Sequence, residues 1–539
     1  MSVITDFATP QLLPLSEPSR PTQPPRIPER RSRIAFTTVA AQPQSTAPPP
    51  TRSNRSTTAE QQQWIATSHF FPAAWPRSHA RSARSDTHQP LPARSRPFAA
   101  LPIDPQQAKA EEKRQRESDF AVWKQHIGSK ERSGATIQEL REQGAARNHA
   151  SRLEQARRDN EEQLWACVQR IVPSEPSHDA SAGQEGYTLI VSHANGLHKE
   201  LWEPALSHIV QTLSLPAADG AEGDGRQRRT GSPVRIDEIW SFDCTHSGEA
   251  ASVNRDRLGD VVSWFDHPRD VMQFLDHFLP PPPSSSSSMS GVQRWHPTML
   301  PRTDGRAHAQ KRKFILLGHS FGGTTMATLA ECRPDSFAGL VLVDPAMPDD
   351  EARASKVTFD PEAVPLARGA VARRDAFGSA SEVRGYCESK PYFGAWDAKV
   401  LNLHLRFGIR PMSVALERAV TVDDLEDDER KRQAVTWSNP KWLEADAFAQ
   451  TWMSLYTLTS LEAGRRTRAW TCHLSMRGGK TSLVKQIPGV PCVPLDGNHL
   501  VVQEEPRKIG EAVARVILEK ATGAGDEAKL LSTVAKPRL

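Results

Sequence analysis

The sequence predicts an α/β fold, in which a mostly parallel sheet carries helices on both of its faces. Segments of strand length rich in Val, Ile and aromatic residues recur along the chain, as in YTLIV at 187–191 and VRIDEIW at 234–240. Amphipathic segments with helical spacing lie between such runs, for example RDVMQFLDHFL at 269–279. Strands that alternate with helices at this spacing are typical of parallel sheets covered on both sides.

Residues 1–115 are expected to form a disordered tail. This segment is rich in Pro, Ser, Thr and Gln with scattered Arg, as in PSRPTQPPRIPERRSR at 18–33. Such a composition buries too little apolar surface to offset the entropy lost on ordering. The arginine excess is compatible with a nucleic-acid arm or a degenerate organelle presequence, and a solvated tail is the simpler interpretation.

Overall composition excludes several functional classes. The net charge of +4 over 539 residues is too small to indicate a nucleic acid or another polyanion as partner. No apolar stretch is long enough for a transmembrane segment, and the N-terminus lacks the apolar core of a secretory signal. The six cysteines are widely spaced, without C-x-x-C pairs or histidines at zinc spacing. We therefore expect an intracellular protein with reduced thiols and with no metal or other cofactor.

Composition shifts divide the rest of the chain. Residues 116–345 are predicted to form the first part of an α/β core, with Pro-rich and Ser-rich tracts as loop insertions. Residues 466–523 complete the core, and residues 524–539 form a C-terminal tail. More than a hundred residues separate the two core parts, too many for a simple connection. Residues 346–465 are therefore predicted to form a helical cap over the active site.

The predicted cap contains Trp396, Trp437, Trp442 and Trp452. These rings could line an apolar substrate tunnel or pack the interior of the cap. Packing is the expected role for most of them, because large aromatic side chains dominate the cores of domains.

The segment KFILLGHSFGGTT at 313–325 predicts a catalytic serine. Ser320 follows an apolar strand and precedes a helical pattern, which is the strand, sharp turn and helix order of a nucleophile elbow. Gly318 and Gly322 remove side chains that would collide with neighbouring backbone, and His319 lies between Gly318 and the serine. A G-x-S-x-G match alone is a weak signal, and the context makes Ser320 the predicted nucleophile rather than a turn serine.

A serine nucleophile needs a histidine base, and in this kind of fold the residues occur in the order serine, acid, histidine. His499 lies in a polar turn between an apolar run and the terminal helical segment, where a base loop after the last strand belongs. His404 falls in a helical pattern and His473 in a strand pattern. Both are expected to be structural histidines, which leaves His499 as the predicted base.

The acid that orients the base is predicted to be Asp344. The usual position follows the penultimate strand, but the turn in AWTCHLSMRGGKTSLV at 469–484 has no carboxylate. Asp344 instead stands at the carboxyl end of the strand that follows the nucleophile helix. There it could reach the same histidine, although an Asp-Pro pair is also ordinary turn chemistry. Asp496 is the alternative acid.

Two backbone N–H groups are predicted to form an oxyanion hole. One belongs to Phe321, which follows the nucleophile at the start of a helix. The other is assigned to Asn195, in the SHANG segment at 192–196 that follows an earlier strand. His193 is expected to anchor this loop rather than to act as a second base.

At these motifs the sequence resembles a known family. The segments SHANGLHKELWEPAL at 192–206, LLGHSFGG at 316–323, LVLVDPAMP at 340–348 and AWDAKVLNLHLRFGIRP at 395–411 are similar to the fungal α/β-hydrolases that include the yeast peroxisomal lipase and the toxin-biosynthesis hydrolases. The resemblance covers about residues 120–520, apart from two insertions. It implies an α/β-hydrolase fold and a peroxisomal serine hydrolase that acts on ester or acyl bonds.

The expected function is therefore a carboxylesterase or lipase-like serine hydrolase, with an acyl-enzyme on Ser320 and a small apolar ester or acyl compound as substrate. An acyltransferase with the same triad is one alternative, because an alcohol or thiol could replace water as acceptor. A catalytically silent binding protein on the hydrolase fold is the other.

The chain ends in Pro537, Arg538 and Leu539. Its last two residues fit the S-K-L type of peroxisomal signal, whereas Pro537 stands where that signal has a small residue. The import receptor is therefore an expected partner and the peroxisome the expected location, with the cytoplasm as the alternative.

Overall fold

The structure is a computed structural model. It describes residues 12–17, 24–25, 33–39, 61–88, 105–126, 149–174, 185–214, 234–282, 299–347, 364–412, 433–450, 453, 470–476 and 490–522. The predicted C-terminal tail, Trp452, the predicted insertion at about 216–233 and the turn after residue 476 lie outside these ranges.

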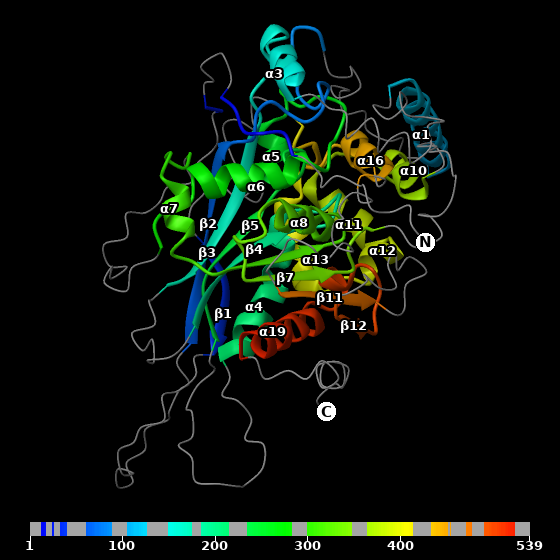
Figure 1. Cartoon of the computed structure of the whole chain (residues 1–539). Helices are drawn as coiled ribbons and strands as arrows, with labels where there is room; N and C mark the ends of the chain where they lie inside the picture. The colour runs from blue at the N-terminus through cyan, green and yellow to red at the C-terminus, as the bar shows by residue number, and fades with distance from the viewer. Residues whose placement is uncertain are drawn as a thin grey trace, which may run out of the picture.

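A nine-stranded sheet forms the centre of the molecule (Figure 1). Its strand order is β1-β2-β3-β5-β4-β6-β7-β11-β12. The strands are β1 (Arg33–Val39), β2 (Gln61–Pro72), β3 (Trp165–Pro173), β4 (Glu185–Ser192), β5 (Val234–Phe242), β6 (Phe314–His319), β7 (Gly339–Val343), β11 (Trp470–Met476) and β12 (Cys492–Leu495).

Parallel pairing joins the strands from β5 through β12, whereas β1, β2 and β3 continue the sheet by antiparallel pairing. The prediction of a mostly parallel sheet is confirmed. Since all parallel strands run in one direction, the loops at their carboxyl ends gather along one edge, which is where binding sites form in such sheets.

Helices cover both faces of this sheet. On one face lie α4 (Glu203–Ser214) and α19 (Pro506–Thr522), which pack against each other (Figure 1). The other face carries α6 (Asp266–His277) and α8 (Phe321–Cys332), which are also in mutual contact.

The central strands contribute alternate side chains to two hydrophobic clusters, one on each face of the sheet. In β4 the buried Leu189 and Val191 belong to the cluster beneath α4 and α19, and Ile190 belongs to the cluster beneath α6 and α8. Successive side chains of a strand point to opposite faces, so a strand covered on both sides is apolar at every position. This is why Leu189, Ile190 and Val191 form a continuous apolar run.

The remaining elements lie around this core. They are α1 (Pro105–His126), α3 (His149–Arg158), η3 (Lys199–Trp202), α5 (Gly248–Val253), α7 (Gly305–Ala309), α10 (Pro365–Ala372), α11 (Ala380–Glu388), α12 (Pro391–Gly394), α13 (Ala398–Phe407), α16 (Lys441–Ala449), α18 (Val501–Glu504) and the short strands β8 (Ala376–Phe377), β9 (Ile409–Pro411) and β10 (Val435–Trp437). The short strands form a separate sheet in the order β8-β10-β9.

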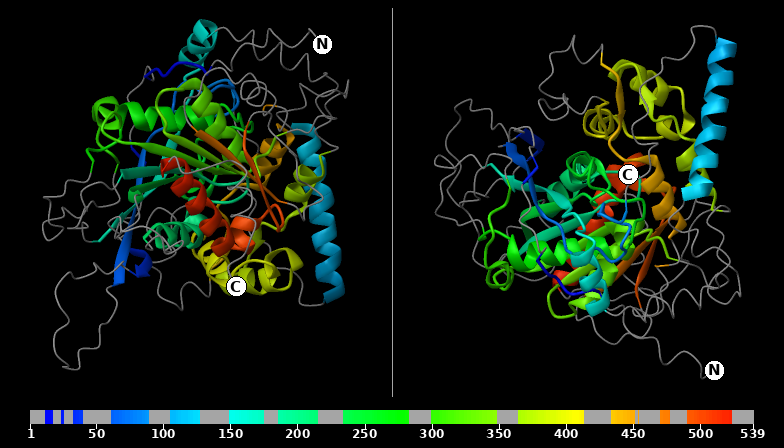
Figure 2. Two further views of the ribbon diagram at one scale, coloured as in Figure 1. Left: turned by 60° about the horizontal axis from the view of Figure 1, so that its bottom comes forward. Right: turned by 90° about the horizontal axis from the view of Figure 1, so that it is seen from above.

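The elements from α10 to α16 lie where the sequence predicts a helical cap. Trp396 and Trp437 belong to a buried cluster that also contains Ala194 and Leu197 from the loop after β4. Trp442 belongs to a second cluster, in which α1 contributes Trp123, and α1 runs along the outside of the molecule (Figure 2). These three tryptophans are therefore buried in packed hydrophobic clusters.

The prediction that residues 1–115 are disordered is wrong for the parts that the structure describes. β1 pairs with β2, and β2 pairs with β3 over nine residues from Trp64 to Pro72. Trp64 and Phe71 of β2 are buried in the two main core clusters. Composition averaged over 115 residues hides the short apolar segment WIATSHFF, whose side chains can enter a core although their surroundings are polar.

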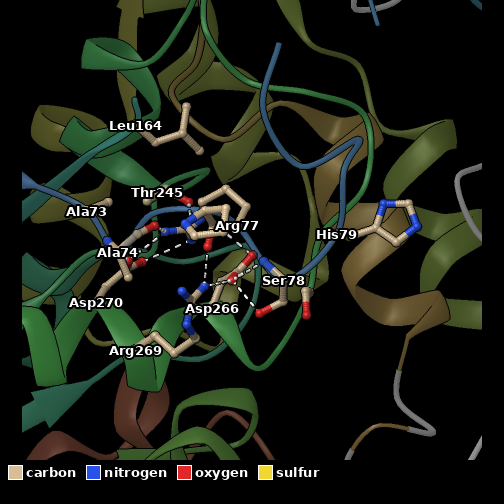
Figure 3. Close-up of polar contacts among 12 residues, drawn as sticks. Ala73, Ala74, Arg77, Ser78, His79, Leu164, Thr245, Asp266, Arg269 and Asp270 are labelled. Atoms are coloured by element: carbon tan, nitrogen blue, oxygen red, sulfur yellow. Dashed lines mark hydrogen bonds and ion pairs between the residues drawn. The ribbon is translucent and has the colours of Figure 1, made fainter. Parts of the chain in front are cut away.

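The segment after β2 carries a buried ion network (Figure 3). The Nη1 atom of Arg77 lies 2.6 Å from Oδ1 of Asp270, and its Nη2 lies 3.1 Å from Oδ2. The carboxylate of Asp266 lies between Arg77 and Arg269. Its Oδ1 atom is 3.0 Å from Nη1 of Arg269. Arg269 also donates to the carbonyl oxygen of Leu13 at 2.7 Å. Two described N-terminal segments are thus tied to α6 by charged groups that are almost inaccessible to water.

Candidate active site

Ser320 occupies a strained turn between β6 and α8. Its φ of 54° and ψ of −119° lie in a region that non-glycine residues rarely adopt. A Cβ on Gly318 would lie 2.4 Å from the carbonyl oxygen of Gly322, and one on Gly322 would lie 2.5 Å from that of Ser192. Both glycines are therefore required by close backbone contacts, as the predicted elbow demands.

His499 and Asp344 lie beside this serine. The Nε2 atom of His499 is 2.9 Å from Oγ of Ser320, and its Nδ1 is 2.6 Å from Oδ2 of Asp344. Topology brings them together: Ser320 follows β6, Asp344 follows the neighbouring β7, and His499 lies in the loop after β12. The structure thus joins the three predicted triad residues in one chain of hydrogen bonds.

The hydrogen-bond partners determine which ring nitrogen of His499 carries the proton. An ionised carboxylate only accepts hydrogen bonds, so the Asp344 side chain requires a proton on Nδ1. Nε2 then presents its lone pair to the hydroxyl of Ser320, as a general base must. The Asp344 side chain is 4% exposed, whereas that of His499 is 25% exposed.

Backbone geometry also supports the position of Asp344. Its φ is 39°, and its N–H donates to the carbonyl oxygen of Leu474 in β11 at 2.9 Å. The alternative acid, Asp496, has an exposed side chain, and its backbone carbonyl accepts from Lys508. The structure therefore places Asp344, and not Asp496, against the imidazole.

The two predicted oxyanion donors lie at the carboxyl ends of neighbouring strands. Phe321 begins α8, and Asn195 lies in the loop after β4, the strand that pairs with β6. Neither backbone N–H donates to a protein group among the residues that the structure describes. Both remain available to a substrate oxygen, although their role stays a prediction.

The loop that carries Asn195 is anchored by His193. The Nδ1 atom of His193 donates to the carbonyl oxygen of Ala194 at 2.8 Å, and its Nε2 accepts the N–H of Cys244 at 3.3 Å. Burial lowers the pKa of this histidine, which keeps the ring neutral with one donor and one acceptor nitrogen. The prediction that His193 anchors the loop is confirmed.

Residues from the region of α16, which no sequence motif indicated, also hold this loop. The side-chain amide of Asn195 donates to the carbonyl oxygen of Glu444 at 3.0 Å, and that of Asn439 donates to the carbonyl oxygen of Leu197 at 3.0 Å. The Glu444 carboxylate also pairs with Arg373 at 2.7 Å. Asn439 and Glu444 are each more than 240 residues from their partners in the loop, and no local sequence pattern indicates such contacts.

The other downstream histidines are buried outside the triad. His404 lies in α13 and stacks on His198 with ring centroids 5.4 Å apart. His473 lies in β11 and is fully buried. Burial lowers the pKa of His473 to about 4, so its ring is neutral near pH 7. Neither belongs to the hydrogen-bond chain of Ser320, His499 and Asp344.

Comparison with known proteins gives the class first. A sequence model described as the alpha/beta hydrolase fold matches residues 294–364, which contain β6, Ser320, α8, β7 and Asp344. Together with the sheet order and the helices on both faces, this match shows that the chain has the α/β-hydrolase fold. The expectation from the sequence motifs is confirmed.

Two curated proteins with similar sequences come from fungi. The chain is 27% identical over 170 residues to the type I acyl-CoA thioesterase mpaH of Penicillium roqueforti, which covers 32% of this chain and 29% of that protein. It is 27% identical over 159 residues to the peroxisomal membrane protein LPX1 of Saccharomyces cerevisiae, covering 30% of each. The matched part thus spans less than a third of these curated relatives.

A solved structure of the yeast peroxisomal α/β-hydrolase Lpx1 is similar with a TM-score of 0.45 and 17% identity, covering 70% of this chain and 85% of that one.

Among the described helices of the present chain, none has both the length and the apolar character needed to cross a bilayer.

Proposed function

We propose that this protein is a serine hydrolase that cleaves ester or thioester bonds through an acyl-enzyme. The observation that carries the proposal is the hydrogen-bond chain from Ser320 through His499 to Asp344, with distances of 2.9 and 2.6 Å. The first expectation was an esterase or lipase-like enzyme. We include thioesters among the proposed substrates because a relative is named as an acyl-CoA thioesterase. The carbonyl carbon of a thioester is attacked by the same serine nucleophile.

The proposed reaction begins when Oγ of Ser320 attacks the carbonyl carbon of the substrate. The hydroxyl proton passes to Nε2 of His499, and the carbonyl electrons move onto oxygen, where the N–H groups of Asn195 and Phe321 stabilise the negative charge. The tetrahedral intermediate then collapses. The bond to the leaving alcohol or thiol breaks, and that group takes the proton from His499.

Deacylation repeats these steps with water as nucleophile. Water gives a proton to Nε2 of His499 and attacks the acyl carbon, and the second tetrahedral intermediate releases the acid. Oγ of Ser320 recovers the proton as it leaves. Asp344 keeps its negative charge throughout and stabilises the imidazolium that forms twice in each cycle.

Labelling with a fluorophosphonate probe tests this proposal. We expect the full-length protein to be labelled once, and Ser320→Ala to lose the label while keeping the melting temperature of the wild type. Ser336→Ala is the control, because this exposed serine lies in the turn that follows α8. A folded wild type that neither reacts with the probe nor releases thiol from an acyl-CoA or alcohol from a p-nitrophenyl ester would favour a silent binding protein.

We also propose that the protein resides in the peroxisome. Support comes from the relative named as a peroxisomal protein in Saccharomyces cerevisiae, and from Arg538 and Leu539, which lie outside the described residues. An N-terminal fluorescent fusion is expected to colocalise with a peroxisomal marker and to become diffuse when these two residues are removed. A diffuse signal from the intact fusion would contradict the proposal.

A further inference from the structure

His319 makes a contact that the elbow motif does not explain. It is the last residue of β6, directly before the nucleophile, and its side chain is fully buried. Its Nε2 atom lies 2.7 Å from the backbone carbonyl oxygen of His499, a residue 180 positions further along the chain. The carbonyl only accepts, so Nε2 of His319 is the donor.

This donor is a neutral imidazole. Burial, reinforced by the neighbouring His499, lowers the pKa of His319 to about 3. The Nδ1 atom is buried and has no hydrogen-bond partner among the described residues, which agrees with a single proton on Nε2. The two rings are 5.2 Å apart. A cation at that distance would oppose the positive charge that His499 takes up in the proposed reaction, and a neutral ring does not.

The bond constrains the backbone of the base, and the side chain of His499 has few other restraints. His499 stands in a loop that begins after Leu495 and ends where α18 starts at Val501. Its side chain is 25% exposed, so packing alone restrains it weakly. Asp344 holds the imidazole at Nδ1, and His319 holds the same residue at its carbonyl oxygen. One hydrogen bond at the backbone carbonyl and one at the side chain together fix the position of His499 and the orientation of its ring.

We propose that His319 is a positioning residue that couples the nucleophile to the base, by holding the carbonyl of His499 to the end of the strand that carries Ser320. The proposal rests on the proposed hydrolase function and adds to it a role for the residue before the nucleophile. Because His319 and Ser320 are consecutive, any movement of the elbow moves the anchor of the base with it. The distance between Oγ and Nε2 is thereby kept within hydrogen-bond reach.

Two substitutions of His319 distinguish the effect of losing the hydrogen-bond donor from the effect of changing the ring. His319→Phe keeps a planar ring of similar size but removes the donor, whereas the amide nitrogen of His319→Gln can take the place of Nε2. We expect kcat for a p-nitrophenyl ester to fall about tenfold to a hundredfold in the phenylalanine variant, because small misplacements of catalytic groups have effects of this size. KM should change less than twofold, and the glutamine variant should recover most of the lost kcat.

His473→Phe is the matched control, because His473 is an equally buried histidine in β11 whose ring nitrogens have no hydrogen-bond partner among the described residues. It should keep the wild-type kcat while matching any loss of melting temperature in His319→Phe. If His319→Phe keeps the kcat of His473→Phe, or if the glutamine variant is no better than the phenylalanine variant, the proposal is overturned.

A crystal structure of His319→Phe gives a readout that does not depend on hydrolysis. We expect the distance between Nε2 of His499 and Oγ of Ser320 to exceed hydrogen-bond range, from 2.9 Å in the native arrangement. An unchanged distance would overturn the positioning role, whatever the activity. Failure of the proposed function has a different signature, which is a folded wild type that does not react with the fluorophosphonate probe.

Discussion

Replacement of Asp344 by asparagine is expected to lower kcat by about 10⁴-fold, the loss typical when the acid of a serine triad becomes an amide. The carboxylate accepts the Nδ1 proton of His499 at 2.6 Å. An amide can instead donate to Nδ1, which moves the ring proton to Nε2. In that tautomer Nε2 has no lone pair for the hydroxyl of Ser320. The geometry of the site survives, but the base is lost.

Steady-state hydrolysis of a p-nitrophenyl ester measures this loss, and circular dichroism confirms that the variant is folded. Asp496→Asn is the matched control, because Asp496 was the alternative acid and its side chain is exposed. It should retain the wild-type kcat. A collapse of activity in Asp496→Asn, together with little change in Asp344→Asn, would overturn the assignment of the acid.

The second large effect concerns stability. Arg77→Ala is expected to reduce the free energy of unfolding by about 3–5 kcal/mol, because removing one partner of a buried ion pair leaves the other charge uncompensated. Asp270 would lose both of its contacts with the guanidinium, at 2.6 and 3.1 Å (Figure 3). Asp266 is affected less, since Arg269 remains beside it.

The pKa values of these groups agree with that asymmetry. Burial raises the pKa of Asp270 despite the nearby Arg77. For Asp266 burial acts in the same direction, but Arg77 and Arg269 outweigh it and the pKa is lowered. Asp270 is thus the carboxylate whose ionisation depends most on Arg77, and it is the group expected to protonate in Arg77→Ala.

Urea unfolding of the full chain, followed by tryptophan fluorescence, measures this effect. Arg302→Ala is the control, because Arg302 forms an ion pair with Glu17 in which both side chains are more than half exposed. An exposed pair contributes about 0–1 kcal/mol. Should Arg77→Ala cost no more than Arg302→Ala, the segment after β2 would not be an integral part of the folded core.

Much of the candidate site could be predicted because its signals are local or ordered along the chain. An apolar strand, two glycines and a helix within a few residues indicate Ser320 as the candidate nucleophile. Asp344 and His499 follow from chain order, given a penultimate turn without a carboxylate. The structure brings these residues within hydrogen-bond distance of one another. Each prediction concerns the end of a strand, and the parallel sheet places those ends side by side.

Other features could not be predicted, because they depend on contacts between distant segments. Composition suggested that the N-terminal region is disordered, yet β2 pairs with β3 and Arg77 reaches α6. Likewise, nothing near Asn195 in the sequence points to Glu444, whose carbonyl holds its side chain. A short segment in a polar region adds little to a composition average, but it can still fill an open sheet edge.

By itself the sequence determined the class of fold, the strand, turn and helix around Ser320 and the chain order of the three candidate triad residues, since these follow from periodicity and from the few backbone conformations that a strand, turn and helix allow. Only the tertiary structure decided that the N-terminal strands complete the sheet, that the cap residues hold the loop of Asn195, and that His319 reaches the carbonyl of His499. Those contacts arise from the burial of polar groups that must find partners wherever the fold brings one within reach.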